Sequence, residues 1–143
     1  MIYFDSAYIA KCYLNESGAE RVRELARTAD GLVSCQIARV ELFATVHRHL
    51  REGHLKTRHL RQVLKQFEGD ENEGIWQWFP VTPSLVTEAC RRLQTLPATV
   101  LIRAVDALHL ACARAEGLSE IYTSDRHMIA AASYFELEGR NLL

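Results

Sequence analysis

Short apolar segments alternate with longer segments of helical periodicity along almost the whole chain, and this alternation limits the fold more than any other feature. Strands are predicted at residues 2–4, 32–35, 75–81, 121–123 and, as an edge strand, 135–137. Helices are predicted at residues 6–13, 17–29, 37–50, 55–67, 83–93, 101–115 and 128–132. Strands that alternate with helices form a parallel sheet, because a parallel connection crosses over through a helix. The predicted fold class is therefore α/β, a three-layer α/β/α sandwich with a mostly parallel central sheet.

The length and the local signals agree with a single domain that spans residues 1–143. Ser6 is a suitable N-cap for the first helix, and Ser17 and Glu20 form a capping box for the second. The acidic residues 68–74 are predicted to end the fourth helix in a solvated loop. The four cysteines contain no C-x-x-C pair, so they are predicted to be reduced thiols that fill core positions.

Charge and hydropathy limit the cellular locations and the classes of partner that we expect for this protein. The 17 Lys and Arg residues nearly balance the 18 Asp and Glu residues, so the net charge alone indicates no nucleic-acid partner. The apolar runs are too short to cross a bilayer, which takes about 20 residues, and the first residues lack the basic stretch of a signal peptide. We therefore expect a soluble, cytoplasmic protein that is not bound to a membrane.

Two acids, Asp5 and Asp125, come directly after short apolar strands and directly before helices. The carboxyl ends of parallel strands meet at one edge of a sheet, where ligands bind in open α/β folds. Either acid alone could serve as a helix N-cap, which is a common role of Asp. Because Ser6 is available to cap the first helix, the occurrence of both acids favours a shared site.

Glu41 and Asp106 stand out because they lie in helical segments rich in apolar residues. Glu41 lies at the edge of an apolar stripe, and Asp106 lies in a helix that is apolar nearly all round, where Asp is a poor helix former. A buried carboxylate is costly unless something compensates it. One compensation is an ion pair, of Asp106 with Arg103 or of Glu41 with a nearby arginine. The other is a Mg²⁺ or Mn²⁺ ion shared by all four acids, since these hard cations take oxygen ligands.

The four acids and their local sequences together resemble the PIN-domain ribonucleases, in particular the VapC-type toxins of bacterial toxin–antitoxin pairs. The matching segments are Tyr3–Ala7, Ala38–Leu42, Arg103–Ala111 and Tyr122–Met128. The resemblance covers essentially the whole chain, and the last two segments are specific. It implies a PIN-like α/β fold and a metal-dependent endoribonuclease that is usually homodimeric. It also implies a small antitoxin partner whose tail reaches the active site.

The resemblance implies a role for each acid. Asp5 and Asp106 are expected to bind Mg²⁺ or Mn²⁺ directly, and Asp125 is expected to complete the metal site through a direct bond or a water. Glu41 is expected to orient the attacking water or a second metal ion. Thr123 matches a hydroxyl residue that orients a water or a ligand carboxylate. The expected RNA products carry 5′-phosphate and 3′-hydroxyl ends.

Residues 47–61 form the only stretch with a marked positive excess, and the stretch follows Glu41 closely in the sequence. RNA contacts are therefore expected from Arg48, Arg51, Arg58 and Arg61, although solvated helix faces explain the same charges equally well. The six histidines lack the helical spacing of a zinc pair and are predicted to be surface or substrate-facing side chains.

Two other functions share parts of this pattern. A metal-dependent phosphatase with an aspartyl nucleophile could use Asp5, but that chemistry normally needs a second acid two residues later, where the chain has Ala7. A non-catalytic α/β binding domain would not need Glu41 and Asp106 on apolar helices. The ribonuclease therefore accounts for more of the sequence than either alternative.

Overall fold

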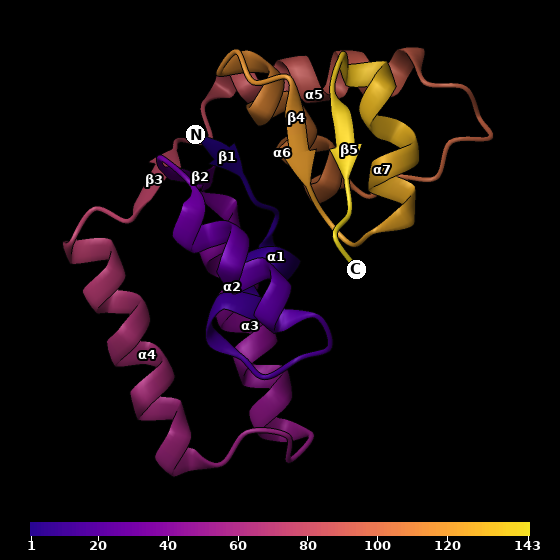
Figure 1. The fold of residues 1–143 in the computed structure, drawn as a ribbon. Coiled ribbons are helices and arrows are strands. Elements are labelled where there is room, and N and C mark those ends of the chain that lie inside the picture. Colours follow the sequence, from indigo (N-terminus) through magenta and orange to yellow (C-terminus); the bar gives the residue numbers. More distant parts are fainter.

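The computed structural model describes residues 1–143 and places parallel strands in a layer between two sets of helices (Figure 1). The strands are β1 (Ile2–Tyr3), β2 (Leu32–Cys35), β3 (Trp76–Phe79), β4 (Glu120–Tyr122) and β5 (Glu138–Arg140). The helices are α1 (Ser6–Tyr13), α2 (Ala19–Thr28), α3 (Ile37–Arg51), α4 (Thr57–Asn72), α5 (Pro83–Thr95), α6 (Ala104–Ala115), α7 (Arg126–Ala132) and the 3₁₀ helix η1 (Ser133–Phe135). Strands and helices follow one another in the predicted order.

All strand pairs are parallel, as predicted. β1 pairs with β2, with Tyr3 opposite Val33, and β2 pairs with β3. β4 pairs with β5, and an isolated parallel bridge between Phe4 and Tyr122 joins the two sheets. β1 therefore lies in the middle of the layer, in the order β3-β2-β1-β4-β5, and its carboxyl end lies beside the carboxyl end of β4.

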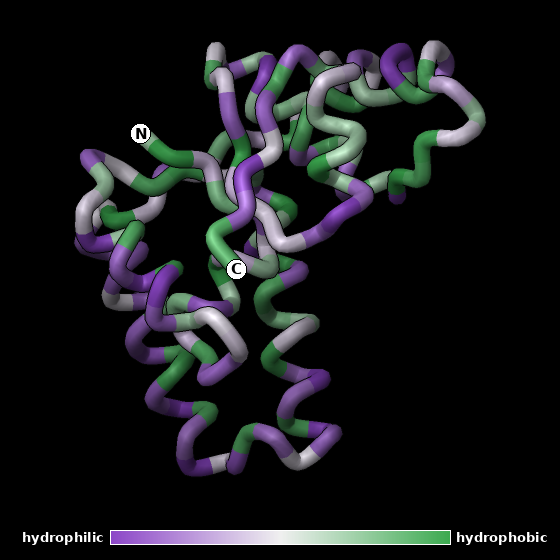
Figure 2. Tube along the Cα trace, turned by 45° about the vertical axis from the view of Figure 1, so that its right-hand side comes forward, coloured by the Kyte–Doolittle hydropathy of each residue, from purple (hydrophilic) through white to green (hydrophobic).

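The two faces of the sheet bury separate hydrophobic clusters, because successive side chains of a strand point to opposite faces. On one face, Tyr3 and Val33 pack with α5, α6 and α7. On the other face, Phe4 and Leu32 pack with α1, α2, α3 and the Phe67 side chain of α4. The chain therefore forms the predicted three-layer α/β/α sandwich. The α3–α4 connection projects away from the sheet (Figure 1), and Figure 2 shows that it is mostly hydrophilic.

The first two helices are capped differently from the prediction. Asp5 caps α1 by accepting a hydrogen bond from the Tyr8 backbone N–H at 2.8 Å, so Ser6 is the first helical residue rather than the cap. α2 begins after Gly18, whose φ of 78° glycine adopts without strain. The predicted capping box fails because this left-handed turn places Ser17 one residue too early to cap the helix.

α4 continues through most of the acidic residues that were predicted to form a solvated loop. It reaches Asn72 because two of these acids have partners in the protein. Asp70 accepts a hydrogen bond from the Tyr13 hydroxyl, and Glu71 pairs with Arg39 at 2.8 Å. The loop prediction is therefore wrong, and the reason is tertiary contact rather than helix propensity.

Other predictions hold in outline and differ in detail. α6 begins at Ala104 rather than at residue 101, and the last strand follows residues 135–137 instead of including them. All four cysteines are free thiols, and Cys35 and Cys112 are buried in the core, but Cys90 is exposed. None of the helices has the length and apolar character needed to span a membrane.

Candidate active site

Asp5 follows β1 and lies inside the protein. The residue is 5% exposed, and its Oδ1 accepts the Tyr8 N–H bond that caps α1. Burial raises the pKa of Asp5 to about 6, and hydrogen bonds with the Thr123 hydroxyl and the Tyr8 N–H oppose this rise by favouring the charged form. The carboxylate is therefore held in place at the carboxyl end of the central strand.

Asp125 occupies the equivalent position after β4, beside Asp5. The Asp5 backbone N–H donates to the Tyr122 carbonyl at 3.1 Å, so the two strand ends are in direct contact. Asp125 Oδ1 accepts from the backbone N–H groups of His127 (2.7 Å) and Met128 (3.3 Å), which makes Asp125 the N-cap of α7. Both acids cap a helix, and both lie at the sheet edge where the sequence predicts a shared site.

Thr123, the hydroxyl residue singled out in the sequence, is completely buried between these two acids. Its Oγ1 accepts from the Asp125 backbone N–H at 2.9 Å. Its hydroxyl also faces Asp5, whose charged form it stabilises. One side chain thus fixes the backbone of one acid and the carboxylate of the other.

Asp106 lies in the first turn of α6, and the predicted mid-helix position is wrong. Because the helix begins at Ala104, Asp106 is the third helical residue, and its Oδ2 accepts from the Arg103 backbone N–H at 3.3 Å. The two side chains form no ion pair, so the Asp106–Arg103 alternative fails. Asp106 is half-buried, and burial, with the neighbouring Asp125 charge, raises its pKa.

Glu41 lies in the second turn of α3, and its partner is a histidine rather than an arginine. Glu41 Oε2 lies 2.7 Å from Nε2 of His109 on α6, and His109 Nδ1 lies 2.8 Å from the Tyr3 hydroxyl. His109 is only 1% exposed, so the prediction of surface or substrate-facing histidines fails for this residue. Its signal in the sequence is a position three residues after Asp106 in the same apolar helix.

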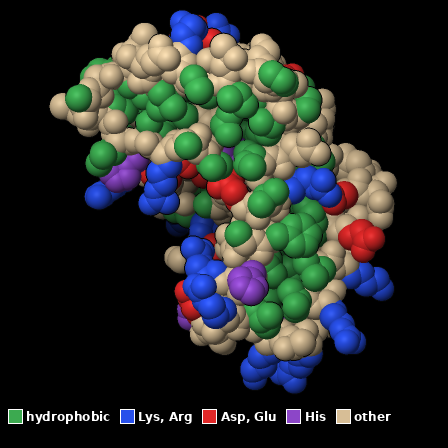
Figure 3. Space-filling model, turned by 180° about the vertical axis from the view of Figure 1, so that it is seen from behind, with side chains coloured by type: hydrophobic (Ala, Val, Ile, Leu, Met, Phe, Trp, Pro, Cys, Tyr) green, Lys and Arg blue, Asp and Glu red, His purple; other side chains and the backbone are tan.

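The four acids come from four different elements but share one edge of the sheet. Beyond the larger effect of burial, negative charge at Glu41 raises the pKa of both Asp5 and Asp106. No lysine or arginine forms an ion pair with any of the four, and only Glu41 has a basic partner, His109. Figure 3 shows acidic side chains in the hollow between the upper and lower parts of the molecule, with basic side chains at its rim.

The donor set suits a hard divalent cation, although no three of these side chains lie close enough together to enclose an ion by themselves. Mg²⁺ binds through one or two carboxylates and retains several waters, so spaced carboxylates are sufficient. The donors are all oxygens, and burial raises the pKa of Asp5 and of Asp106, although the nearby His109 lowers both values. These residues therefore fit Mg²⁺ or Mn²⁺.

The basic residues 47–61 lie at the far end of α3 and the start of α4. The four arginines expected to contact RNA are all exposed; they are Arg48, Arg51, Arg58 and Arg61. Between Glu41 and Arg51, α3 extends roughly 15 Å along its axis. The stretch therefore does not border the four acids, and its contact with RNA stays a prediction.

Two other arginines, which the sequence reasoning missed, adjoin the acids. Arg103 is the N-cap residue of α6, three residues before Asp106, and Arg126 is the first residue of α7, directly after Asp125. Both are exposed, and neither side chain forms an ion pair. Their signal in the sequence was a position next to an acid rather than membership of a basic run.

A cavity of about 770 Å³ lies at the opposite end of the sheet. The starts of β2 and β3, together with α1, α2 and the end of α4, line it. There Asp70 accepts from the Tyr13 hydroxyl at 2.7 Å, and the Trp76 Nε1–H donates to the Tyr13 oxygen at 2.6 Å. Cavity size alone would therefore place the active site away from the four acids, whereas the chemistry of the side chains places it at the four acids.

The geometry defines a class of α/β/α sandwich proteins that carry four acids at the carboxyl edge of a parallel sheet. A family model described as the PIN domain matches residues 2–133, and the chain therefore belongs to the PIN domain family. Among curated proteins, no sequence matches the chain.

Three solved structures share the fold. VapC20 of Mycobacterium tuberculosis, described as a Sarcin–Ricin loop cleaving toxin, has a TM-score of 0.73 at 16% identity, covering 96% of this chain and 99% of that chain. VapBC2 of Rickettsia felis, bound to a DNA fragment from its promoter, has a TM-score of 0.69 at 16% identity, with 100% of both chains covered. FitAB bound to an IR36 DNA fragment has a TM-score of 0.63 at 17% identity, covering 99% of this chain and 94% of that chain. At these identities the likeness is one of fold.

Proposed function

We propose that this protein is a metal-dependent endoribonuclease that hydrolyses RNA phosphodiester bonds and acts as the toxin of a toxin–antitoxin pair. The proposal is carried by the position of Asp5, Glu41, Asp106 and Asp125 at one sheet edge of a PIN domain, where no basic side chain of the protein forms an ion pair with the three aspartates. The similar fold of VapC20, a Sarcin–Ricin loop cleaving toxin, supports RNA as the substrate class.

When bound, a Mg²⁺ or Mn²⁺ ion supplies neutralisation of the charge that develops on the phosphate and a source of hydroxide near neutral pH. Asp5 and Asp106 would hold the ion, because buried and uncompensated carboxylates gain most from a nearby cation. Asp125 would complete the site through a direct bond or a water, and Thr123 would keep the carboxylates oriented. Glu41 would orient the attacking water through the oxygen that its hydrogen bond leaves free.

Exposed arginines give this site a surface for the phosphates of RNA. Arg103 and Arg126 adjoin Asp106 and Asp125, so they would meet the phosphates nearest to the cleaved bond. A second set lies further away on α3 and α4 and would extend the binding surface or face a protein partner; it consists of Arg48, Arg51, Arg58 and Arg61.

We propose a cognate antitoxin and a second copy of this chain as the protein partners, in the cytoplasm. Val40 and Phe43 on α3 are 65% and 47% exposed, and such apolar side chains favour burial by a partner. Structures named VapBC2 and FitAB share this fold, and each of these names combines two components, which supports a second protein as partner.

Incubation of the purified protein with an RNA that contains single-stranded and stem–loop segments tests the proposal. We expect cleavage with Mg²⁺ or Mn²⁺, none with a chelator, and strongly reduced cleavage by the Asp5→Asn variant, which keeps the helix cap. The products are expected to carry 5′-phosphate and 3′-hydroxyl ends. RNA binding without cleavage under every metal condition would assign a binding domain instead. Hydrolysis of p-nitrophenyl phosphate without RNA cleavage would assign a phosphatase.

A further inference from the structure

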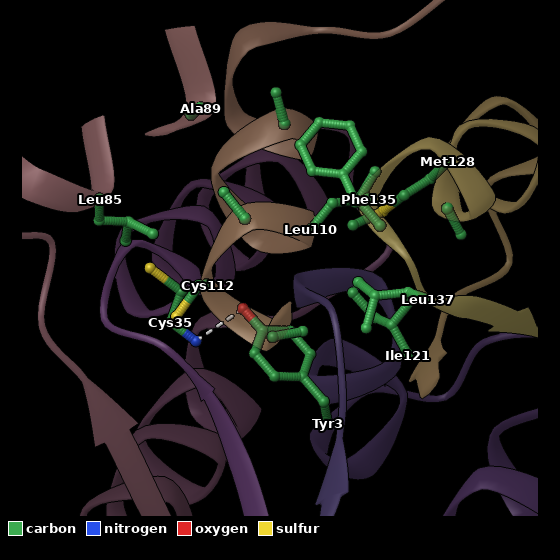
Figure 4. Packing of buried hydrophobic residues seen from close by; sticks show 14 of the residues in the cluster. Tyr3, Cys35, Leu85, Ala89, Leu110, Cys112, Ile121, Met128, Phe135 and Leu137 are labelled. Carbon is green, nitrogen blue, oxygen red and sulfur yellow. Dashed lines mark hydrogen bonds between the residues drawn. The ribbon is translucent and has the colours of Figure 1, made fainter. Parts of the chain in front are cut away.

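A continuous chain of hydrogen bonds links the core of the sheet with Glu41. The Cys35 backbone N–H donates to the Tyr3 hydroxyl oxygen at 2.9 Å, and the Tyr3 hydroxyl lies 2.8 Å from Nδ1 of His109. Nε2 of the same imidazole lies 2.7 Å from Oε2 of Glu41. Figure 4 shows the first of these bonds, in which the Tyr3 ring points toward Cys35 at the end of β2.

The direction of each hydrogen bond follows from the groups that form it. A backbone N–H can only donate, so the Tyr3 oxygen accepts from Cys35 and the Tyr3 proton is available to His109 Nδ1. An ionised carboxylate can only accept, so Nε2 of His109 carries the hydrogen that is donated to Glu41. Tyr3 and His109 are 0% and 1% exposed, so water cannot replace these partners.

The imidazole of His109 has little freedom to choose another partner. It packs edge-on against the Tyr3 ring, with ring centroids 5.8 Å apart and planes at 86°. Burial alone would lower the pKa of His109, but the hydrogen bond and the charge of Glu41 outweigh it and raise that pKa. The hydrogen on Nε2 is present in both protonation states, so the bond to Glu41 persists in each.

The bond from His109 to Glu41 connects the two helical layers across the edge of the sheet. α3 packs on one face of the sheet and α6 on the other. Asp106 and His109 lie one turn apart on α6, and Tyr3 lies two residues before Asp5 on the central strand. The elements that present two of the site aspartates therefore also hold the carboxylate of Glu41.

We propose that His109, held in turn by Tyr3, is a positioning residue that fixes one oxygen of Glu41 and thereby aims the other oxygen at the attacking water. Without this bond the Glu41 side chain, which is only partly buried, has several rotatable bonds and no other partner in the protein. The inference rests on the proposed nuclease function, because it assigns His109 a task in that reaction.

A double-mutant cycle between His109 and Glu41 tests the inference with metal-dependent RNA cleavage as the readout. His109→Leu is expected to lower kcat by about 10- to 100-fold, the usual loss when the partner that orients a site residue is removed. KM for RNA and the affinity for Mn²⁺, measured by calorimetry, should change less than about twofold, because the metal-site aspartates stay in place. In a Glu41→Ala background the same substitution should cost no further activity.

Three further variants separate positioning from support of the fold. His109→Gln keeps an N–H donor near the position of Nε2 and should recover most of kcat. Tyr3→Phe removes the outer anchor of His109 together with the acceptor of the Cys35 N–H. It should lower kcat several-fold in the folded protein and should also have no added effect on kcat in the Glu41→Ala background. Leu110→Val, a change at the next fully buried position of α6, is the control and should leave kcat unchanged in the folded protein.

The outcomes distinguish the inference from the function on which it rests. Effects of His109→Leu and Glu41→Ala that add in full would overturn the positioning role. If His109→Leu does not fold, additive effects of Tyr3→Phe and Glu41→Ala would overturn it instead. If the Glu41→Ala variant cleaves RNA as fast as the wild type does, the inference is rejected while the proposed function stands. A wild-type protein that cleaves no RNA with any divalent metal would reject the proposed function, and the inference with it.

Discussion

Both ends of the parallel sheet hold acidic groups that are partly or fully buried, but the two ends satisfy them in opposite ways. At the amino end, Asp70 accepts a hydrogen bond from Tyr13, which in turn accepts one from Trp76 beside the 770 Å³ cavity. At the carboxyl end, Asp5 and Asp106 receive only backbone and hydroxyl donors, and Glu41 adds a negative charge near both of them. The same residue type is thus part of a closed network at one end and part of an incomplete one at the other.

The difference shows that the balance of charge distinguishes a functional site from a structural one better than cavity volume does. A network that the protein completes by itself stabilises the fold and needs no ligand. A cluster of like charges costs stability in the folded state and persists where it serves a function. We therefore expect Asp70, at the amino end of the sheet, to contribute to stability, and the acids at the carboxyl end to contribute to catalysis.

Matched substitutions at the two ends should produce the largest contrast. Asp5→Asn should reduce metal-dependent RNA cleavage by on the order of 100- to 1,000-fold, because a ligand of the catalytic cation is lost. Asp70→Asn should leave cleavage unchanged and lower the free energy of unfolding by about 1 to 2 kcal/mol, because the Tyr13 hydroxyl loses a charged acceptor. Cleavage rates and urea unfolding of both variants check this, and equal losses of activity would remove the distinction between the two ends.

Metal should stabilise the carboxyl end alone. Wild-type protein at about 100 times the dissociation constant of Mn²⁺ should gain on the order of 10 °C in melting temperature. Asp106→Asn keeps the first-turn hydrogen bond and removes one like charge. It should be as stable as the metal-free wild type or more stable at pH 7, and should gain much less from metal. A destabilised variant, with no response of the wild type to metal, would contradict a shared cation site.

The metal-free protein should lose stability as the pH rises toward neutrality. Asp5 has a pKa of about 6 in the folded protein, above its ordinary value of 3.8, mainly because of burial. The folded state therefore binds this proton more tightly, so the stabilisation is complete below about pH 4 and is lost as the pH rises through 6. The expected loss over the whole range is about 3 kcal/mol in the presence of a chelator, of which roughly half falls between pH 5 and pH 7.

Thermal melts between pH 5 and pH 7 measure this effect together with losses of the same sign from Asp106 and His109, whose pKa values are also raised. The pKa of Glu88 is lowered to about 2 by its hydrogen bonds with Arg91 and Arg92, so its contribution changes only at lower pH. Asp5→Asn should make the profile less steep, whereas Asp70→Asn should retain it. A wild-type profile that rises over this range would show that the Asp5 carboxylate is compensated after all.

The smallest expected effect concerns RNA binding at the carboxyl end. Arg103 and Arg126 adjoin the acids, so replacing both with Gln should lower the slope of log affinity against log salt by about 1.4, or 0.7 for each lost phosphate contact. The same change at Arg58 and Arg61 on α4 is the matched control and should alter the slope less. Filter binding to a single-stranded RNA at several salt concentrations decides between the two pairs. A larger change at Arg58 and Arg61 would restore the basic stretch as the main RNA contact.

The parts of the site that follow from chain direction could be predicted from the sequence. Asp5 and Asp125 each follow an apolar strand, and parallel strands bring such positions to one edge. Asp106 was included in the site on a weaker basis, since the helix starts three residues later than predicted and makes its position an ordinary first-turn one. An unusual residue in an apolar segment thus marked the site even where the helix boundary was wrong.

The parts that depend on contacts between distant segments could not be predicted. His109 meets Tyr3 and Glu41 only because two helical layers converge at the sheet edge, and no local pattern carries that information. The basic residues 47–61 follow Glu41 in sequence, but an α-helix of this length moves them away from it. The sequence around Asp70 predicts a solvated loop, because the partner of this acid, Tyr13, is remote in the sequence.

The single bridge between Phe4 and Tyr122 also determines when the site can form during synthesis of the chain. Asp5 and Glu41 are synthesised early, whereas Asp106 and Asp125 arrive in the last part of the chain. Pairing of the first strand with the fourth closes a long loop, which is a slow step compared with the formation of local helices. A nascent or truncated chain without β4 holds three of the four acids but lacks Asp125 and the strand that places it next to β1. The proposed nuclease would thus stay inactive on the ribosome until nearly the whole chain has emerged and folded.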